Sequence, residues 1–419
     1  MKKNKSAVLL FALCWCAYAV SYVGRLNFSS CLSPMAQDGI FTSEYGGAVG
    51  TAFLACYGCG QLLSGFLGDR IKPEYMIFTG LAGSGCANIL MACVNNGTQA
   101  IFIWGLNGLF CSMLWAPLVR CFADYMDSGD RMRAGINIST TIPVGTICAY
   151  LLCSLLLNFA SWRTVFAVSG AAVLLCSAVW LAGMLSIRKY CRAVSYENIR
   201  QRQAFSEKSA ASGNKKSGFF KLFITYGVIF TAVAILFNGV LKDGITVWIP
   251  TFLKNTFGVS ASFAAAISII LPIVNLLGAY GANLLNRRVI KNEMATSGVM
   301  FAISLMSILT LYFAGHSSIV LSAFLLALST SSMLGANTMF LTFIPLSFGA
   351  FGRSASMTGF LDACSYIASA VSSLLIGITA VRFGWNVTVL IWGAVALCGG
   401  AICAAGMGKW KKSREILQS

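Results

Sequence analysis

The sequence predicts an all-α membrane protein in which twelve transmembrane helices form two pseudo-symmetric six-helix halves. Of its 419 residues, 57% are apolar and only 10% are charged, whereas roughly 25% of the residues of a soluble domain are charged. The apolar residues gather in long uninterrupted runs, and several features recur at about half the length of the chain. This composition excludes a soluble globular protein, a disordered chain and a disulfide-stabilised miniprotein.

Each transmembrane helix needs about 20 apolar residues, because the hydrocarbon core of a bilayer is roughly 30 Å thick. The runs in this chain are continuous, which favours helices over the alternating ten-residue strands of a membrane barrel. Twelve runs meet the requirement: 7–30, 44–66, 75–95, 99–120, 135–158, 163–186, 222–245, 261–285, 294–315, 318–343, 355–380 and 386–407.

One long polar stretch sets the expected domain boundaries. Residues 187–221 are rich in Ser, Lys, Arg and Gln, a composition typical of a flexible linker. We therefore expect an N-terminal six-helix half at 1–186, a cytoplasmic linker at 187–221 and a C-terminal six-helix half at 222–419.

The basic residues set the orientation in the membrane. The chain has 30 Lys and Arg against 13 Asp and Glu, for a net charge of +17. On the side of the termini and the linker lie 25 of these cations, and only Arg163, Lys254 and Arg382 lie on the other side. The positive-inside rule then predicts cytoplasmic termini. Because this excess has a topological cause, we expect no nucleic-acid partner.

Two cations remain, and both fall inside apolar runs. Arg25 and Lys242 occupy positions where a charge costs at least about 2.5–3.5 kcal/mol. They lie 217 residues apart, and Asp69 and Asn286, each followed by Arg, have the same separation. Internal repeats of this kind are a feature of transporter folds. Arg25 and Lys242 are therefore predicted pseudo-symmetry mates on the first helix of each half.

Polar residues accompany both cations on one helix face. Tyr18, Tyr22 and Arg25 follow at spacings of four and three, and Asn238 lies four residues before Lys242. A guanidinium with phenol hydroxyls on the same stripe suits an anion with several oxygens, because it offers a planar fork of donors. The sequence thus predicts a substrate site for a small anion.

A structural role for the two cations is the competing interpretation. They would then reach towards an interface or pair with Asp362, a deeply placed carboxylate in span 11. Asp243 adjoins Lys242, but consecutive residues of an α-helix do not face each other, so we expect no pair between them. One acid cannot neutralise two cations, which favours the anion site.

A glycine-rich loop between spans 2 and 3 ends in an acid–base pair, Asp69-Arg70, after Gly65 and Gly68. This loop resembles the signature loop of the major facilitator superfamily. The resemblance implies that Asp69 and Arg70 form a cytoplasmic gate. The second-half copy, Asn286-Arg287, has an amide in place of the acid, so we expect a weaker gate contact there.

Within that superfamily the chain resembles the organophosphate:phosphate antiporter family of glycerol-3-phosphate and hexose-phosphate transporters. Four segments carry the resemblance: Tyr18-x3-Tyr22-x2-Arg25-x-Asn27-Phe28, Asp69-Arg70-x2-Pro73, Gly108-x6-Trp115-x-Pro117-x2-Arg120 and Lys242-x-Gly244-x3-Trp248-x-Pro250. It implies exchange of inorganic phosphate for an organophosphate by alternating access, with Arg25 and Lys242 binding the phosphoryl group. It also implies a monomer in the lipid bilayer, which we place in the bacterial inner membrane.

Other functions remain open at this stage. A proton-coupled hexuronate or carboxylate symporter of the same superfamily also fits the first-helix motif, and Asp362 would then carry the proton. A transporter-like sugar-phosphate sensor is a third possibility. We expect no enzyme, metal or cofactor, because the chain has one histidine, His316, and its 16 cysteines form no ligand spacing with it.

Overall fold

The computed structural model describes residues 2–40, 43–197, 223–259 and 271–418. Within these ranges the chain consists of helices joined by short turns, and it contains no strand. The all-α fold class predicted from the apolar runs is therefore confirmed.

Nine helical stretches in the described ranges are long and apolar enough to cross a membrane. They coincide with nine of the twelve predicted spans. The other three predicted spans are helical over 75–91, 271–285 and 355–380, and residues 261–270 of the span predicted at 261–285 lie outside the described residues. The segments 75–91 and 355–380 carry many Ser, Thr, Asn and Gly residues. Membrane helices use such residues to contact each other rather than lipid.

The chain divides into two compact units. Unit 1 comprises Met1–Glu207 and Phe348–Phe360, and unit 2 comprises Lys208–Ser347 and Leu361–Ser419. The predicted linker at 187–221 lies largely outside the described residues. Its described part is helical over 188–197, where Cys191 and Val194 share a face and are buried.

Unit 1 contains the first six spans. Besides the helical stretch 188–197, its described helices are α1 (Lys2–Gln37), α2 (Ser43–Gly68), α3 (Pro73–Met91), α4 (Gly97–Tyr125), α5 (Ser128–Asn137), η1 (Ile138–Thr140), α6 (Thr141–Phe159), α7 (Trp162–Ser186) and the short turn η6 (Phe348–Phe351). α4 begins at an N-cap, because the Asn96 side chain accepts the N–H of Gln99 at 2.9 Å.

Small residues let the helices of unit 1 approach closely. A methyl group at Gly108 of α4 would lie 2.3 Å from the carbonyl oxygen of Phe53 on α2. Without a side chain at Gly108, the two backbones can meet directly, as in other membrane helix pairs. This contact fixes α2 against α4, and it places Phe53 beside α1, where one predicted site residue lies.

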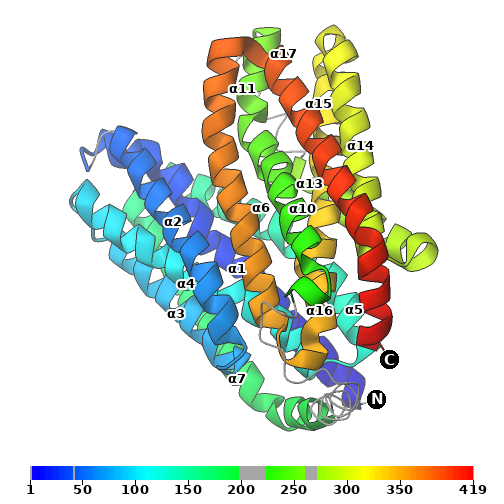
Figure 1. The fold of residues 1–419 in the computed structure, drawn as a ribbon. Helices are drawn as coiled ribbons and strands as arrows, with labels where there is room; N and C mark the ends of the chain where they lie inside the picture. Colours follow the sequence, from blue (N-terminus) through cyan, green and yellow to red (C-terminus); the bar gives the residue numbers. More distant parts are fainter. Residues whose placement is uncertain (1, 41–42, 198–222, 260–270, 419) are drawn as a thin grey trace. The chain divides into compact units, whose positions relative to one another are not determined.

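Unit 2 contains the remaining helices. They are α10 (Val228–Gly239), η2 (Val240–Gly244), α11 (Ile245–Phe257), α13 (Leu271–Leu285), η3 (Asn286–Ile290), α14 (Glu293–Ala314), η4 (Gly315–Ser317), α15 (Ile319–Thr338), η5 (Met339–Phe343), α16 (Ile344–Ser347) and most of α17 (Ser354–Gln418). α17 breaks at Gly384, whose φ of 79° favours glycine. Figure 1 shows its orange and red arms running in opposite directions from this bend.

Three helical turns of unit 2, namely η2, η3 and η5, are π-helical rather than α-helical. Such turns are rare and often occur at functional sites, because they shift the register of the side chains that follow. Two of them contain residues predicted to be functional: Lys242 lies in η2 and Asn286 in η3.

Candidate functional site

Arg25 lies on α1 among three aromatic rings of unit 1. Its guanidinium carbon is 4.6 Å from the ring centroid of Tyr57, 5.6 Å from that of Tyr22 and 5.7 Å from that of Phe53. Cation–π contacts of this length contribute about 0.5–2 kcal/mol each. The three rings therefore help to hold the guanidinium at this place on α1.

The predicted tyrosine stripe continues from Arg25 along α1. The rings of Tyr18 and Tyr22 meet edge to face at 5.6 Å, and Tyr18 also packs on Trp115 of α4 at 4.8 Å. Both tyrosines are buried. The structure therefore brings together the three first-helix residues that the spacing predicts, and it adds Trp115 to them.

Two buried polar groups of unit 1 lie on the helices that pack beside this stripe, α2 and α4. Trp115 belongs to a motif quoted above, whereas no sequence pattern identifies Gln61. Gln61 of α2 is fully buried, and neither its side-chain oxygen nor its nitrogen has a hydrogen-bond partner among the described residues. The indole N–H of Trp115 is likewise unpaired in the described part of the chain. Gln61 follows Tyr57 by four residues, so both lie on the same face of α2. Unpaired buried polar groups cost about 1–3 kcal/mol each, which suggests that something else binds them.

Lys242 of unit 2 pairs with its neighbour, contrary to the expectation from helix geometry. Its Nζ lies 2.8 Å from Oδ1 of Asp243, and the two side chains are 19% and 34% exposed. Both residues lie in the π-helical turn η2, whose wider winding separates consecutive side chains less than an α-helix does. The long lysine stem then completes the contact. Ser369 also donates to Asp243 Oδ2 at 2.8 Å.

The other two predicted substrate residues of unit 2 are buried. Asn238 donates its amide to the carbonyl oxygen of Met333 on α15 at 2.7 Å, so it fastens α10 to α15. Asp362 of α17 is 4% exposed and interacts electrostatically with Lys242. Unit 2 therefore brings Lys242 within range of two carboxylates, those of Asp243 and Asp362.

The predicted gate acid, Asp69, contacts the first turn of α17 within unit 1. Its carboxylate accepts the backbone N–H groups of Ala355 and Ser356 at 3.1 and 3.2 Å and the hydroxyl of Ser356. The first N–H groups of a helix have no partner within the helix and carry positive partial charge. Asp69 therefore acts as an anionic cap supplied from another part of the chain.

Arg70, the predicted partner of Asp69, is exposed. Arg120 of α4 stabilises the loop instead: its guanidinium donates to the carbonyl oxygens of Gly68 and Ile71, at 2.7 Å for Ile71. Arg120 also pairs with Asp124 at 2.9 Å. The sequence motif contains Arg120, but its link to the loop depends on the fold.

The second-half counterparts of the gate residues contact unit 2 itself. Asn286 donates to the Glu293 carboxylate at 3.3 Å and accepts the Thr296 hydroxyl at 3.1 Å. Glu293 also receives the indole N–H of Trp410 at 2.8 Å. Arg287 is exposed. Asn286 thus joins a buried polar cluster at the start of α14.

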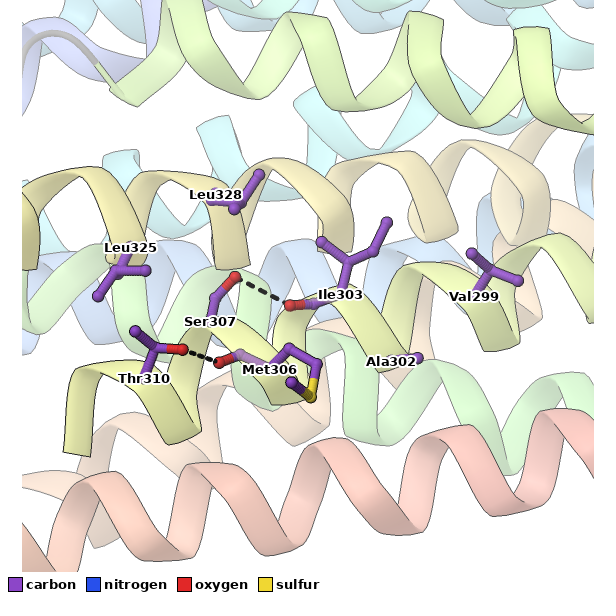
Figure 2. Close-up of a pocket in the computed structure, with 8 residues that line it drawn as sticks. All are labelled: Val299, Ala302, Ile303, Met306, Ser307, Thr310, Leu325 and Leu328. Atoms are coloured by element: carbon purple, nitrogen blue, oxygen red, sulfur yellow. Dashed lines mark hydrogen bonds between the residues drawn. The ribbon is translucent and has the colours of Figure 1, made fainter. Parts of the chain in front are cut away.

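An open groove of about 360 Å³ lies between α14 and α15 (Figure 2). Eight residues line it: Val299, Ala302, Ile303, Met306, Ser307, Thr310, Leu325 and Leu328. Its two hydroxyl groups donate back to carbonyl oxygens of their own helix, Ser307 to Ile303 and Thr310 to Met306, at 2.8 Å each. The groove therefore suits an apolar group and not an anion.

Comparison with known proteins identifies the family. Residues 14–350 match the Major Facilitator Superfamily. The glycerol-3-phosphate transporter of Bacillus subtilis (strain 168) is 24% identical over 382 residues, which cover 88% of this chain and 85% of that protein. The glucose-6-phosphate exchanger SLC37A2 of Mus musculus is 23% identical over 392 residues, or 84% of this chain and 77% of that protein.

A solved structure shows the same fold. The proton:xylose symporter XylE bound to 6-bromo-6-deoxy-D-glucose aligns with a TM-score of 0.74 at 11% identity, and the alignment covers 95% of each chain. These similar proteins are transporters and not enzymes, in agreement with the prediction from the sequence. The chain belongs to the Major Facilitator Superfamily.

Proposed function

We propose that this transporter exchanges an organophosphate, of the sugar-phosphate or glycerol-phosphate type, for inorganic phosphate by alternating access. The observation that carries the proposal is the position of Arg25, whose guanidinium lies inside a membrane span within 5.7 Å of the ring centroids of Tyr22, Phe53 and Tyr57. Arg25 and Lys242 bind the phosphoryl group in this proposal. The relatives named as a glycerol-3-phosphate transporter and a glucose-6-phosphate exchanger support the substrate class.

The pair between Lys242 and Asp243 changes how the second cation works. Since Asp243 already neutralises Lys242 at 2.8 Å, a phosphoryl oxygen has to compete with that carboxylate. Arg25 is then the stronger anion ligand, because its planar fork of donors matches two phosphoryl oxygens at once. Lys242 serves as a point charge whose availability depends on Asp243.

The organic part of the substrate has its own polar groups in this proposal. Gln61 offers two donors and one acceptor, and the Trp115 indole offers one donor. Both are buried and unpaired within the described residues. Hydroxyl groups of a glycerol or sugar moiety would satisfy them, while Tyr18 and Tyr22 pack against its carbon atoms.

The proposal also includes a cytoplasmic gate and an orientation in the membrane. Asp69 and Arg70 in unit 1, with Asn286 and Arg287 in unit 2, form the cytoplasmic gate. The protein acts as a monomer in a bacterial inner membrane with both termini in the cytoplasm, as the distribution of 25 of 30 cations predicts.

A second candidate is a proton-coupled symporter of organic anions. The observation in its favour is Asp362, a carboxylate that is 4% exposed inside a span and interacts electrostatically with Lys242. Intramembrane acids of this kind often carry protons in transporters.

Counterflow in proteoliposomes separates the two candidates. Vesicles loaded with labelled phosphate are diluted into buffer with or without glycerol 3-phosphate or glucose 6-phosphate, at several pH gradients. We expect efflux only when an external phosphorylated compound is present, and we expect Arg25→Ala to abolish it. Equal efflux into empty buffer would exclude obligatory exchange, and uptake driven by a proton gradient alone would favour the symporter.

A further inference from the structure

Four buried polar side chains surround the backbone of α1 at Gly24, the residue before Arg25. They are Asn27 of α1, Ser84 and Asn88 of α3, and Asn107 of α4, and each is 0% exposed. Asn27 belongs to the first-helix motif, but none of the four is a predicted substrate-binding residue. Fully buried polar side chains in a membrane span are expensive unless they are paired, so this cluster needs a physical reason.

The cluster converges on one carbonyl group. The Gly24 oxygen accepts the side-chain amides of Asn88 and Asn107, each at 2.9 Å. The neighbouring bonds fix how these amides are turned: Asn88 Oδ1 accepts from Asn27 at 2.7 Å, and Asn107 Oδ1 accepts from Ser84 at 2.7 Å. Since both oxygens are occupied, both nitrogens point at Gly24.

Little space is left for a side chain at Gly24. A methyl group there would lie 3.0 Å from Asn88 Nδ2, 3.0 Å from Val173 and 3.4 Å from the Ser84 hydroxyl. The two amide donors therefore fix α1 at this point, and the absence of a side chain on Gly24 lets α3 and α7 pack closely against it. The side chain of the next residue, Arg25, then emerges in a defined direction, among Tyr22, Phe53 and Tyr57.

We propose that Asn88 and Asn107 are positioning residues for Arg25. By binding the Gly24 carbonyl, they hold the Arg25 guanidinium where the anion binds. The inference rests on the proposed role of Arg25 in phosphate binding. Bidentate recognition of a phosphoryl group depends on the orientation of the guanidinium plane. A small rotation of α1 would therefore weaken phosphate binding although the charge remains.

The test uses phosphate:phosphate exchange in proteoliposomes, which requires no organic substrate. Asn107→Leu keeps roughly the size of the side chain but removes the donor to the Gly24 carbonyl. We expect it to raise the KM for phosphate about tenfold or more, with a smaller change in kcat. Ser84→Ala is milder, because it leaves both donors to Gly24 in place and removes the bond that orients Asn107 together with a weak contact to Cys111 at 3.5 Å; it should raise the KM in the same direction.

Ser64→Ala is the matched control. Ser64 is also buried in unit 1 and its hydroxyl bonds to that of Ser112 at 3.2 Å, but it lies on α2 and this bond involves neither Gly24 nor its two amide donors. We expect its KM to stay within about twofold of the original value. An equal rise in all three variants, or no rise in a folded Ser84→Ala protein, would overturn the positioning role.

A double variant distinguishes this inference from the proposed function. Arg25→Lys should itself raise the KM, and adding Asn107→Leu to it should raise the KM little further, because neighbours that act as a unit are not additive. Fully additive effects would show that Asn107 acts independently of Arg25. If Arg25→Lys leaves the KM unchanged, it is the proposed phosphate-binding role of Arg25 that fails.

Discussion

The Asp69 carboxylate lies 3.1 Å from the backbone nitrogen of Ala355 and caps the first turn of α17. Residues 348–360 belong to unit 1, although they follow Asp69 by almost 300 residues in the chain. A single side chain therefore holds a distant helix start through its N–H groups and its positive end. The strength of this contact therefore depends on whether the Asp69 carboxyl group is protonated.

Burial raises the pKa of Asp69 from 3.8 to about 6, although the hydrogen bonds from Ser356 and the charges of Arg120 and Arg353 oppose this rise. The folded protein then holds the proton more tightly than the unfolded chain. The resulting stability is fully present below pH 3.8 and is lost as the pH rises through about 6. The Tm of the purified protein should therefore fall between pH 5 and pH 7, and Asp69→Asn should flatten this slope. An identical slope in both proteins would contradict the prediction.

A second prediction concerns the counter-ion of Lys242. Asp243→Asn removes the charge that competes with phosphate for the lysine, and the amide keeps the side-chain size. We expect the apparent affinity for phosphate to rise roughly tenfold, or by about 1.4 kcal/mol, as measured by the KM of phosphate exchange.

Ser369→Ala is the control for that experiment. It removes a hydrogen bond of 2.8 Å to Asp243 but leaves both charges in place, so its effect should be much smaller. A higher KM in Asp243→Asn would show that Asp243 holds Lys242 ready for phosphate and does not compete with it.

Much of the fold could be predicted from the sequence, because the signals are local and repeated. Apolar runs predict helices, and the spacing of Tyr18, Tyr22 and Arg25 predicts their common face, which the structure confirms. The pair between Lys242 and Asp243 could not be predicted, since it depends on a π-helical turn. A single π-helical turn in an otherwise α-helical span leaves no recognisable pattern in the composition or the hydrophobic periodicity.

The hydrogen bonds from Asn88 and Asn107 to the Gly24 carbonyl could not be predicted from the sequence, for a different reason. The two residues lie on separate helices, and each is a single amide within an apolar run. Only the packing of α3 and α4 against α1 brings them to the same carbonyl group. Sequence spacing relates residues on one helix, so it cannot reveal a cluster that three helices build.

A third prediction tests the group assigned to the organic part of the substrate. Gln61→Leu removes the buried amide at similar volume, so the protein should remain folded. We expect phosphate:phosphate exchange to be unchanged and exchange of phosphate for glycerol 3-phosphate or glucose 6-phosphate to lose about tenfold in kcat/KM, the effect of one lost hydrogen bond to a substrate. Equal loss in both exchange modes would mean that Gln61 supports the fold and does not contact the organic moiety.

A fourth prediction concerns the close contact between α2 and α4. The Cβ of Gly108→Ala would meet the carbonyl oxygen of Phe53 at 2.3 Å, so the two backbones have to separate. Phe53 is one of the rings around Arg25, at 5.7 Å. The variant should therefore lower the Tm, by overpacking that costs about 1–3 kcal/mol, and it should also raise the KM for phosphate.

Gly105→Ala, one turn earlier on α4, provides the comparison. Its new methyl group would lie 3.3 Å from the Cys56 sulfur, a side-chain atom that can shift, and 3.9 Å from the nearest backbone oxygen. We expect almost no change in Tm or KM, because the helix backbones need not separate. If Gly105→Ala is as harmful as Gly108→Ala, the cost comes from alanine on this helix face in general. A selective effect of Gly108→Ala would instead show that the backbone contact with Phe53 keeps the aromatic surround of Arg25 in place.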